Sequence, residues 1–215
     1  MIPIRLFIFD LDGTLVDTLE DITHSVNFTL GKLGRPLLHL DTVRQFVGDG
    51  TSVLLSRALD GHDDLLEQAL GIYRVHQSRN LVVRSRLYLG VRETLEHFRS
   101  VPMVVVTNKA KEFSEPLLVE LGIRPYFGMV IGADAGLPLK PAPDAFLKVL
   151  RDLAIPKERA VVVGDGTTDM LAGRSAGITT CAVTYGFRTE EELRRAGPDH
   201  VITTFAQLRT LFRPA

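Results

Sequence analysis

The chain of 215 residues contains no tryptophan, a single cysteine and no excess of charge of either sign. Its 25 Lys and Arg residues balance 26 Asp and Glu residues, so there is no basic field to gather nucleic-acid phosphates. Cys181 alone permits no internal disulfide and no paired-cysteine metal site, which is typical of a protein of the reducing cytoplasm. No apolar stretch approaches the roughly 20 residues of a membrane span, and the N-terminus lacks the features of a signal peptide. We therefore expect a cytoplasmic protein with no nucleic-acid partner and no membrane partner.

The hydrophobic residues, 45% of the chain, form short Val- and Ile-rich runs that alternate with longer amphipathic stretches. This alternation is typical of a parallel sheet with helices on both faces, because strands that are buried on both faces are apolar throughout. The runs predict strands at 4–9, 103–106, 129–131, 160–163, 179–183 and 200–202. The amphipathic stretches predict helices at 91–99, 111–121, 143–153, 169–176, 190–196 and 205–211. The sequence therefore predicts a doubly wound, Rossmann-like α/β fold.

Residues 17–86 interrupt this alternation, because they have helical periodicity but contain no convincing buried strand. They directly follow the first predicted strand, whose carboxyl end lies at the edge of the sheet where ligands bind in such folds. We predict a core domain of residues 1–16 and 87–215 and an inserted α-helical cap domain of residues 17–86. The position of the insert suits a lid over the ligand.

Polar residues follow three of the apolar strands at the point where each strand ends. Asp10 follows LFIF, Thr107 follows MVVV and Asp165 follows VVVG. The carboxyl ends of parallel strands meet at one edge, where the N-termini of the following helices favour an anion. The sequence therefore predicts an anion and metal pocket at this edge.

Asp10 and Asp12 are separated by one residue and precede Gly13, so the chain must turn sharply after the first strand. Residues i and i+2 share a strand face, so one carboxylate can attack a phosphorus atom while the other handles the proton of the leaving oxygen. An Asp-Gly turn with a capping carboxylate is the alternative interpretation. A buried strand that ends in DxDGT favours the catalytic one.

Four segments resemble, in order, the motifs of the haloacid dehalogenase superfamily. They are DLDGTLVD at 10–17, VVVTN at 104–108, LKPAP at 139–143 and VVGDGTTD at 162–169. One such motif alone is weak or moderate evidence, but four in one order across nearly the whole chain are specific. Within the superfamily, FVGDGTSVLLSRAL at 46–59 and YLGVRETLEHFR at 88–99 resemble segments of the phosphoglycolate phosphatase-type branch.

The resemblance implies a catalytic role for residues in the first three motifs. Asp10 would be the nucleophile that forms an aspartyl-phosphate, and Asp12 would be the general acid and base. Thr107 would bind the phosphoryl oxygens together with the backbone N–H groups of Asn108 and Lys109. Lys140 would pair with the nucleophile and with the transferred phosphoryl group.

The same resemblance implies a bound Mg²⁺, a hard ion that prefers oxygen ligands. Asp10, Asp165 and Asp12, the last through its backbone carbonyl, would bind the metal. Asp169 would steady it through water or a neighbouring side chain. Gly166 stands where the family often has serine, which removes a hydroxyl but leaves both acids of the motif in place.

The cap segment 47–52 is the predicted contact with the remainder of the substrate. Gly50 allows close backbone approach, and Thr51 begins a predicted helix whose N–H groups can receive a small carboxylate. An ordinary loop with a Ser/Thr cap fits these residues equally well. Arg44 and Arg57 are further candidate partners for a carboxylate, but the sequence does not place them.

The implied function is the Mg²⁺-dependent hydrolysis of a small phosphorylated metabolite, with 2-phosphoglycolate as the leading candidate. A pyrophosphatase, a nucleotide or sugar-phosphate phosphatase and a phosphomutase of the β-phosphoglucomutase type remain alternatives on the same scaffold. A dehalogenase would not need Asp12, and a receiver-like phosphorylation switch would not need a helical lid. A binding protein without activity would have lost motif residues, whereas here all are present. The sequence leaves the oligomeric state open.

Overall fold

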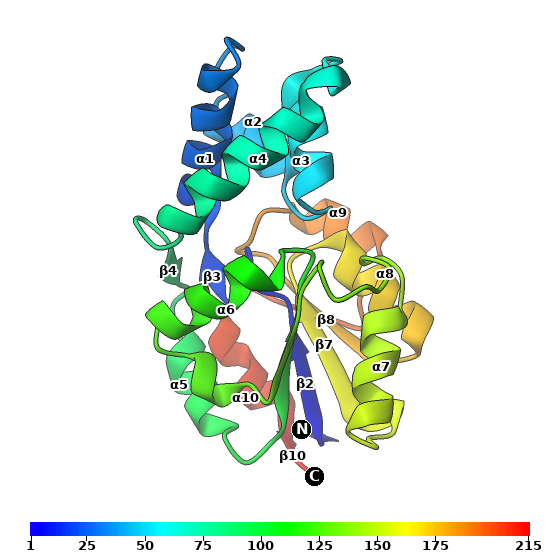
Figure 1. The fold of residues 1–215 in the computed structure, drawn as a ribbon. Coiled ribbons are helices and arrows are strands. Elements are labelled where there is room, and N and C mark those ends of the chain that lie inside the picture. The colour runs from blue at the N-terminus through cyan, green and yellow to red at the C-terminus, as the bar shows by residue number, and fades with distance from the viewer.

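The centre of the protein is a six-stranded parallel sheet, seen in the computed structural model, which describes all 215 residues (Figure 1). The strands lie in the order β6-β5-β2-β7-β8-β9. They are β2 (Leu6–Phe9), β5 (Met103–Val106), β6 (Met129–Ile131), β7 (Ala160–Gly164), β8 (Thr179–Val183) and β9 (His200–Ile202). β2 is paired with β5 and β7, so the three strands that end in polar residues are direct neighbours. The prediction of a parallel α/β core is confirmed.

Helices cover both faces of this sheet, as the amphipathic stretches predict (Figure 1). They are α5 (Val91–His97), α6 (Lys111–Glu120), α7 (Asp144–Asp152), α8 (Thr167–Ala176), α9 (Glu190–Arg195) and α10 (Leu208–Leu211), the last preceded by the 3-10 turn η4 (Phe205–Gln207). The side chains of alternate residues of β2 pack on opposite faces of the sheet. Phe7 and Phe9 belong to a cluster with α5, α6 and α10, whereas Leu6 and Ile8 pack with α7 and α8. β2 is therefore buried on both sides, which explains its continuous apolar run.

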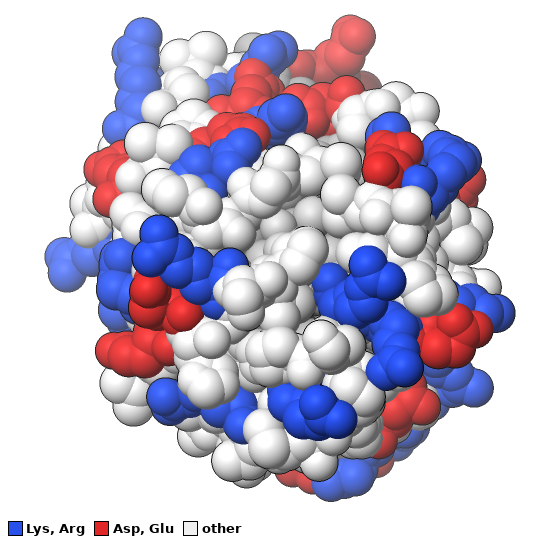
Figure 2. Space-filling model, turned by 90° about the horizontal axis from the view of Figure 1, so that it is seen from below, with Lys and Arg blue, Asp and Glu red and all other residues white.

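The first predicted strand is in fact two strands with different partners. β1 (Ile2–Ile4) pairs in parallel with β10 (Phe212–Pro214), outside the main sheet. The break falls at Arg5, an exposed residue whose N–H group donates to the carbonyl of Arg159. Both chain ends lie at the end of the molecule opposite the cap (Figure 1). Figure 2 shows this end, where basic and acidic side chains surround a largely uncharged centre.

The insert between β3 (Val16–Asp17) and β4 (Arg86–Leu87) is helical and lies above the sheet (Figure 1). It consists of α1 (Leu19–Lys32), α2 (Leu40–Phe46), α3 (Thr51–Leu59), the turn η1 (Asp63–Leu65) and α4 (Leu66–Arg79). The insert has an apolar cluster of its own, separate from those on the sheet. β3 and β4 form a short antiparallel ribbon, at which we divide the cap from the core. None of the helices is both long and apolar enough to cross a bilayer.

Asp21, in the first turn of α1, ties the beginning of the cap to its end. Its carboxylate accepts hydrogen bonds from the backbone N–H groups of Val83, Arg84 and Ser85, at 3.1, 2.9 and 2.8 Å, and from the Ser85 hydroxyl at 2.7 Å. Only 3% of the residue is exposed. The returning segment 83–85 is therefore held against α1 by one buried anion.

We expect Asp21→Ala to lower the free energy of unfolding by about 2–4 kcal/mol, because several N–H groups lose a charged acceptor inside the protein. Urea denaturation measures this change. Asp64→Ala is the matched control, since Asp64 is an exposed cap residue, and it should change stability by no more than about 0.5 kcal/mol. Equal losses for the two variants would contradict the anchoring role of Asp21.

Candidate functional site

Two adjoining pockets lie where the carboxyl ends of β2, β5 and β7 face the cap. Both are lined by Asp10, Asp12, Val47 and Gly48. The Thr107 pocket is further lined by Ile22, Gly50, Thr51, Leu54, Tyr73, Thr107, Asn108 and Lys109. The Asp165 pocket is further lined by Asp49, Asp165, Gly166, Thr167, Thr168, Phe187 and Arg188. The structure therefore brings the residues of the first, second and fourth motifs to one place, with residues 47–51 of the cap above them.

Lys140 forms an ion pair with Asp10 and donates hydrogen bonds to two further groups. Its Nζ is 2.9 Å from Oδ1 of Asp10, 2.6 Å from Oδ1 of Asp169 and 2.9 Å from the carbonyl oxygen of Val106. Burial alone would lower the pKa of Lys140, but the charges of Asp10 and Asp169 raise it well above its ordinary value. The ammonium group is therefore a fixed cation beside Asp10.

Asp169 contacts Lys140 directly and thereby orients it. One carboxylate oxygen accepts from Lys140, and the other accepts from the N–H group of Gly166 at 3.1 Å. A Cβ atom at position 166 would lie 2.9 Å from Oδ2 of Asp169 and 3.1 Å from Oγ1 of Thr168. Glycine therefore gives these neighbours room where the family often has serine.

Asp165 has only neutral hydrogen-bond donors around its carboxylate. The hydroxyl of Thr14 donates to Oδ1 and the N–H group of Phe187 donates to Oδ2, both at 2.8 Å. Burial and then the charge of Asp10 raise the pKa of Asp165 to about 7. A Cβ atom on Gly13 would lie 2.2 Å from Oδ2 of Asp165, and one on Gly186 would lie 2.3 Å from its Cβ. Two glycines thus make the space in which this carboxylate stands.

Asp10 and Asp165 together fit a divalent cation. Oδ1 of Asp10 is buried and close to Lys140 without an aligned hydrogen bond, and Asp165 has no cationic partner. Carboxylate oxygens in such a setting suit Mg²⁺. No set of three Asp, Glu, His or Cys side chains is arranged as a metal site, and the carboxylate of Asp12 is paired with Lys109. The metal would be held by Asp10, Asp165 and the backbone oxygen of Asp12, with water completing the shell.

Asp12 is paired with Lys109, a contact that the sequence analysis missed. Nζ of Lys109 lies 3.2 and 3.1 Å from the two carboxylate oxygens, and the hydroxyl of Thr18 donates to Oδ1 at 2.7 Å. The side chain of Lys109 is 6% exposed. Its position directly after Thr107 and Asn108 was the only available signal, and sequence does not tell which acid such a lysine meets.

Asn108 and Arg188 connect the core to the cap at the mouth of the site. The side-chain amide of Asn108 donates to the carbonyl of Gly48 at 2.9 Å and to that of Lys140 at 3.0 Å. Arg188 donates to the carbonyls of Arg44 and Val47, at the end of α2. Nothing in the sequence marks Arg188 for this contact, because its acceptors are backbone atoms far away along the chain.

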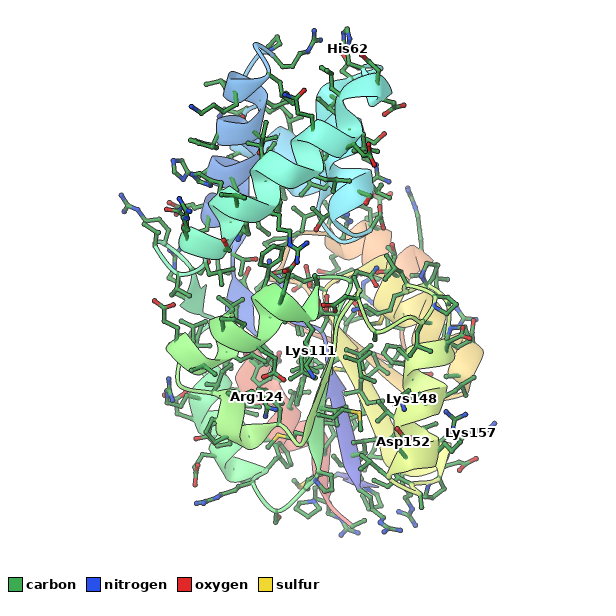
Figure 3. The ribbon with its side chains drawn as sticks, in the orientation of Figure 1. His62, Lys111, Arg124, Lys148, Asp152 and Lys157 are labelled. Atoms are coloured by element: carbon green, nitrogen blue, oxygen red, sulfur yellow. The ribbon has the colours of Figure 1, made fainter.

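The cap loop lies at the Thr107 pocket, whereas the two candidate arginines line neither pocket. Gly50 and Thr51 line the Thr107 pocket, and α3 begins at Thr51. Arg57 instead pairs with Asp49 at 2.7 Å, and neither Arg57 nor Arg44 lines either pocket. His62, one of six histidines without metal-ligand spacing, lies at the far end of the cap (Figure 3).

Residues 7–183 match the family model of haloacid dehalogenase-like hydrolases. Among curated proteins, the phosphoglycolate phosphatase of Pseudomonas savastanoi pv. phaseolicola is 37% identical, over 95% of this chain and 78% of that protein. The phosphoglycolate phosphatase of Nitrosococcus oceani is 36% identical, over 98% of this chain and 97% of that protein. A crystal structure described as a predicted phosphoglycolate phosphatase, from Haemophilus somnus, superimposes with a TM-score of 0.92 at 30% identity and covers 97% of both chains.

We expect Gly186→Ala to weaken Mg²⁺ binding by about tenfold or more, since outer contacts of metal ligands are worth about 10- to 100-fold in affinity. The added methyl group would stand 2.3 Å from Cβ of Asp165 and displace its carboxylate. Calorimetric titration with Mg²⁺ measures the affinity. Gly128→Ala is the control, because a Cβ atom there meets nothing within 4 Å. A folded Gly186→Ala protein with unchanged affinity would show that Asp165 does not hold the metal.

Proposed function

The chain belongs to the haloacid dehalogenase-like hydrolase family, and we propose that it is a Mg²⁺-dependent phosphatase of 2-phosphoglycolate that works through an aspartyl-phosphate. The observation that carries this proposal is the placement of Asp10, Asp12 and Thr107 in one pocket, with Lys140 fixed beside Asp10. The names of the curated relatives, at about a third identity over most of the chain, support the substrate.

In the first half of the proposed reaction, a carboxylate oxygen of Asp10 attacks the phosphorus atom. The bond between phosphorus and the ester oxygen breaks, and its electron pair stays on that oxygen. Asp12 in its protonated form gives its proton to the same oxygen, so the leaving group departs as an alcohol. The phosphoryl group is then an acyl-phosphate on Asp10.

In the second half, water attacks the phosphorus atom of the acyl-phosphate. Asp12, now a carboxylate, accepts a proton from this water, and the bond to Asp10 breaks to release inorganic phosphate. Both carboxylates return to their first states, so the cycle balances. The contacts of Asn108 and Arg188 with the cap favour this chemistry, because a closed cap limits the access of bulk water.

Two neighbours of Asp10 compensate the charge of the phosphoryl group. Lys140 keeps its positive charge there, since the charges of Asp10 and Asp169 raise its pKa. The hydroxyl oxygen of Thr107 accepts from the N–H group of Lys109 at 3.2 Å, which leaves its proton free for a phosphoryl oxygen. Mg²⁺ held by Asp10 and Asp165 would neutralise further negative charge on the phosphoryl oxygens.

We expect phosphate release from 2-phosphoglycolate with Mg²⁺ and none with excess EDTA. A panel with hexose phosphates, nucleotides and pyrophosphate measures the preference. The value of kcat/KM for 2-phosphoglycolate should exceed the others by about 100-fold, or roughly 2.7 kcal/mol of discrimination. Equal values of kcat/KM across the panel would contradict the assignment of 2-phosphoglycolate as the substrate. No phosphate release from any compound would contradict the assignment of phosphatase activity. Release without a bisphosphate activator separates this activity from that of a phosphomutase.

Asp10→Asn is expected to abolish turnover, because an amide cannot replace the attacking carboxylate. Asp12→Asn should lower kcat by about 10²- to 10⁴-fold with a much smaller change in KM, as expected for loss of an acid-base group. Steady-state kinetics on 2-phosphoglycolate measures both variants. Asp152→Asn is the control, since Asp152 pairs with Lys148 on α7, away from the pockets (Figure 3). Full activity of purified Asp10→Asn would show that Asp10 is not the nucleophile.

A further inference from the structure

Lys109 is the only basic side chain that lines the Thr107 pocket. The cap side of this pocket is formed by apolar side chains such as Ile22 and Leu54, together with Thr51 and Tyr73. The cap therefore offers no cation to a charged leaving group. The only cationic side chain of this pocket that an anionic part of a substrate can meet is Lys109, on the core side.

The two buried lysines of the site differ in how many partner groups surround their ammonium groups. Lys140 is surrounded by three separate groups: it donates to Asp169 and to the carbonyl of Val106, and it lies 2.9 Å from Oδ1 of Asp10. Lys109 meets only the two oxygens of the Asp12 carboxylate, so one N–H bond has no protein acceptor. Because the side chain is only 6% exposed, a charged acceptor supplied by the substrate is worth more there than at the surface.

The contact between Lys109 and Asp12 also fixes how far this free donor is from the reacting bond. Nζ lies 3.1 Å from Oδ2 of Asp12. An acid that protonates an ester oxygen stands about 3 Å from it, so Nζ of Lys109 comes within about 6 Å of that oxygen. A carboxylate on the carbon atom that bears the ester oxygen lies within this reach.

We infer that Lys109 binds the substrate's carboxylate and thereby selects phosphate esters of 2-hydroxycarboxylic acids, an inference that rests on the proposed phosphatase function. The ammonium group donates one N–H bond to this carboxylate and keeps its contact with Asp12. Lys109 is thus a specificity-determining residue, and it also positions the general acid. The backbone N–H groups at the start of α3 are the competing candidates for the carboxylate.

Two substrates of nearly the same size separate these roles. In 2-hydroxyethyl phosphate a hydroxymethyl group replaces the carboxylate of 2-phosphoglycolate, while the phosphate ester is unchanged. The readout is the ratio of kcat/KM for 2-phosphoglycolate to kcat/KM for 2-hydroxyethyl phosphate. Loss of the Asp12 contact lowers both values and cancels in the ratio, whereas loss of the carboxylate contact lowers the ratio.

We expect Lys109→Met to lower this ratio by about 10- to 100-fold, the value of one buried charged hydrogen bond. Lys109→Arg keeps the charge and should retain most of the ratio. Lys111→Met is the matched control, since Lys111 stands at the start of α6 (Figure 3), is about half exposed and pairs with Glu115. An unchanged ratio in active Lys109→Met would overturn the inference and assign the carboxylate to the N–H groups of α3.

A binding measurement keeps the inference separate from the proposed function. In the Asp10→Asn background with Mg²⁺, calorimetry gives the affinity for both compounds without turnover. Lys109→Met should weaken the affinity for 2-phosphoglycolate by about 10- to 100-fold and the affinity for 2-hydroxyethyl phosphate by less than about threefold. Lys109-dependent binding in a wild-type protein that releases no phosphate would overturn the phosphatase but support the inference. Equal weakening of both compounds would overturn the inference, whatever the wild-type activity.

Discussion

The crowding of four carboxylates, two of them buried, at the carboxyl edge of the sheet is the constraint on which the rest of this protein depends. Unpaired charges of this kind cost several kcal/mol each inside a protein, so each needs a partner supplied by another part of the chain. Lys140 serves Asp10 and Asp169, and Lys109 serves Asp12. Only Asp165 has neutral donors alone. The distribution of cations thus concentrates the uncompensated negative charge on the side of the Asp165 pocket.

The two pockets that share Asp10 and Asp12 therefore suit different parts of the substrate complex. On one side, Asp10 and Asp165 suit a metal ion, because Asp165 has no cationic partner in the protein. On the other, Thr107, Lys109 and the apolar cap residues suit the ester and its leaving group. Asn108 connects the core to the cap, because its side-chain amide binds both the backbone of Lys140 and the carbonyl of Gly48.

The sequence predicted the sheet well because buried parallel strands are continuous apolar runs. Since the carboxyl ends of such strands meet at one edge, the polar residues that follow them indicated Asp10, Thr107 and Asp165. It could not predict the pairing of β1 with β10, since a three-residue strand near each chain end has no periodicity to reveal its partner. Lys140 and Asp169 were identified only through the resemblance of their motifs. The pairing of Lys109 with Asp12 and the contacts of Arg188 depend on tertiary packing, which spacing along the chain does not encode.

The ribbon of β3 and β4 joins the cap to the core through two strands that lie side by side. Since the cap also buries an apolar cluster of its own, it is structurally an interchangeable module. A different insert between positions 19 and 86 would leave the strand ends, their lysines and the Thr18 contact with Asp12 in place. Diversification of such enzymes can therefore proceed by exchange of one contiguous segment, with the machinery of phosphoryl transfer inherited unchanged.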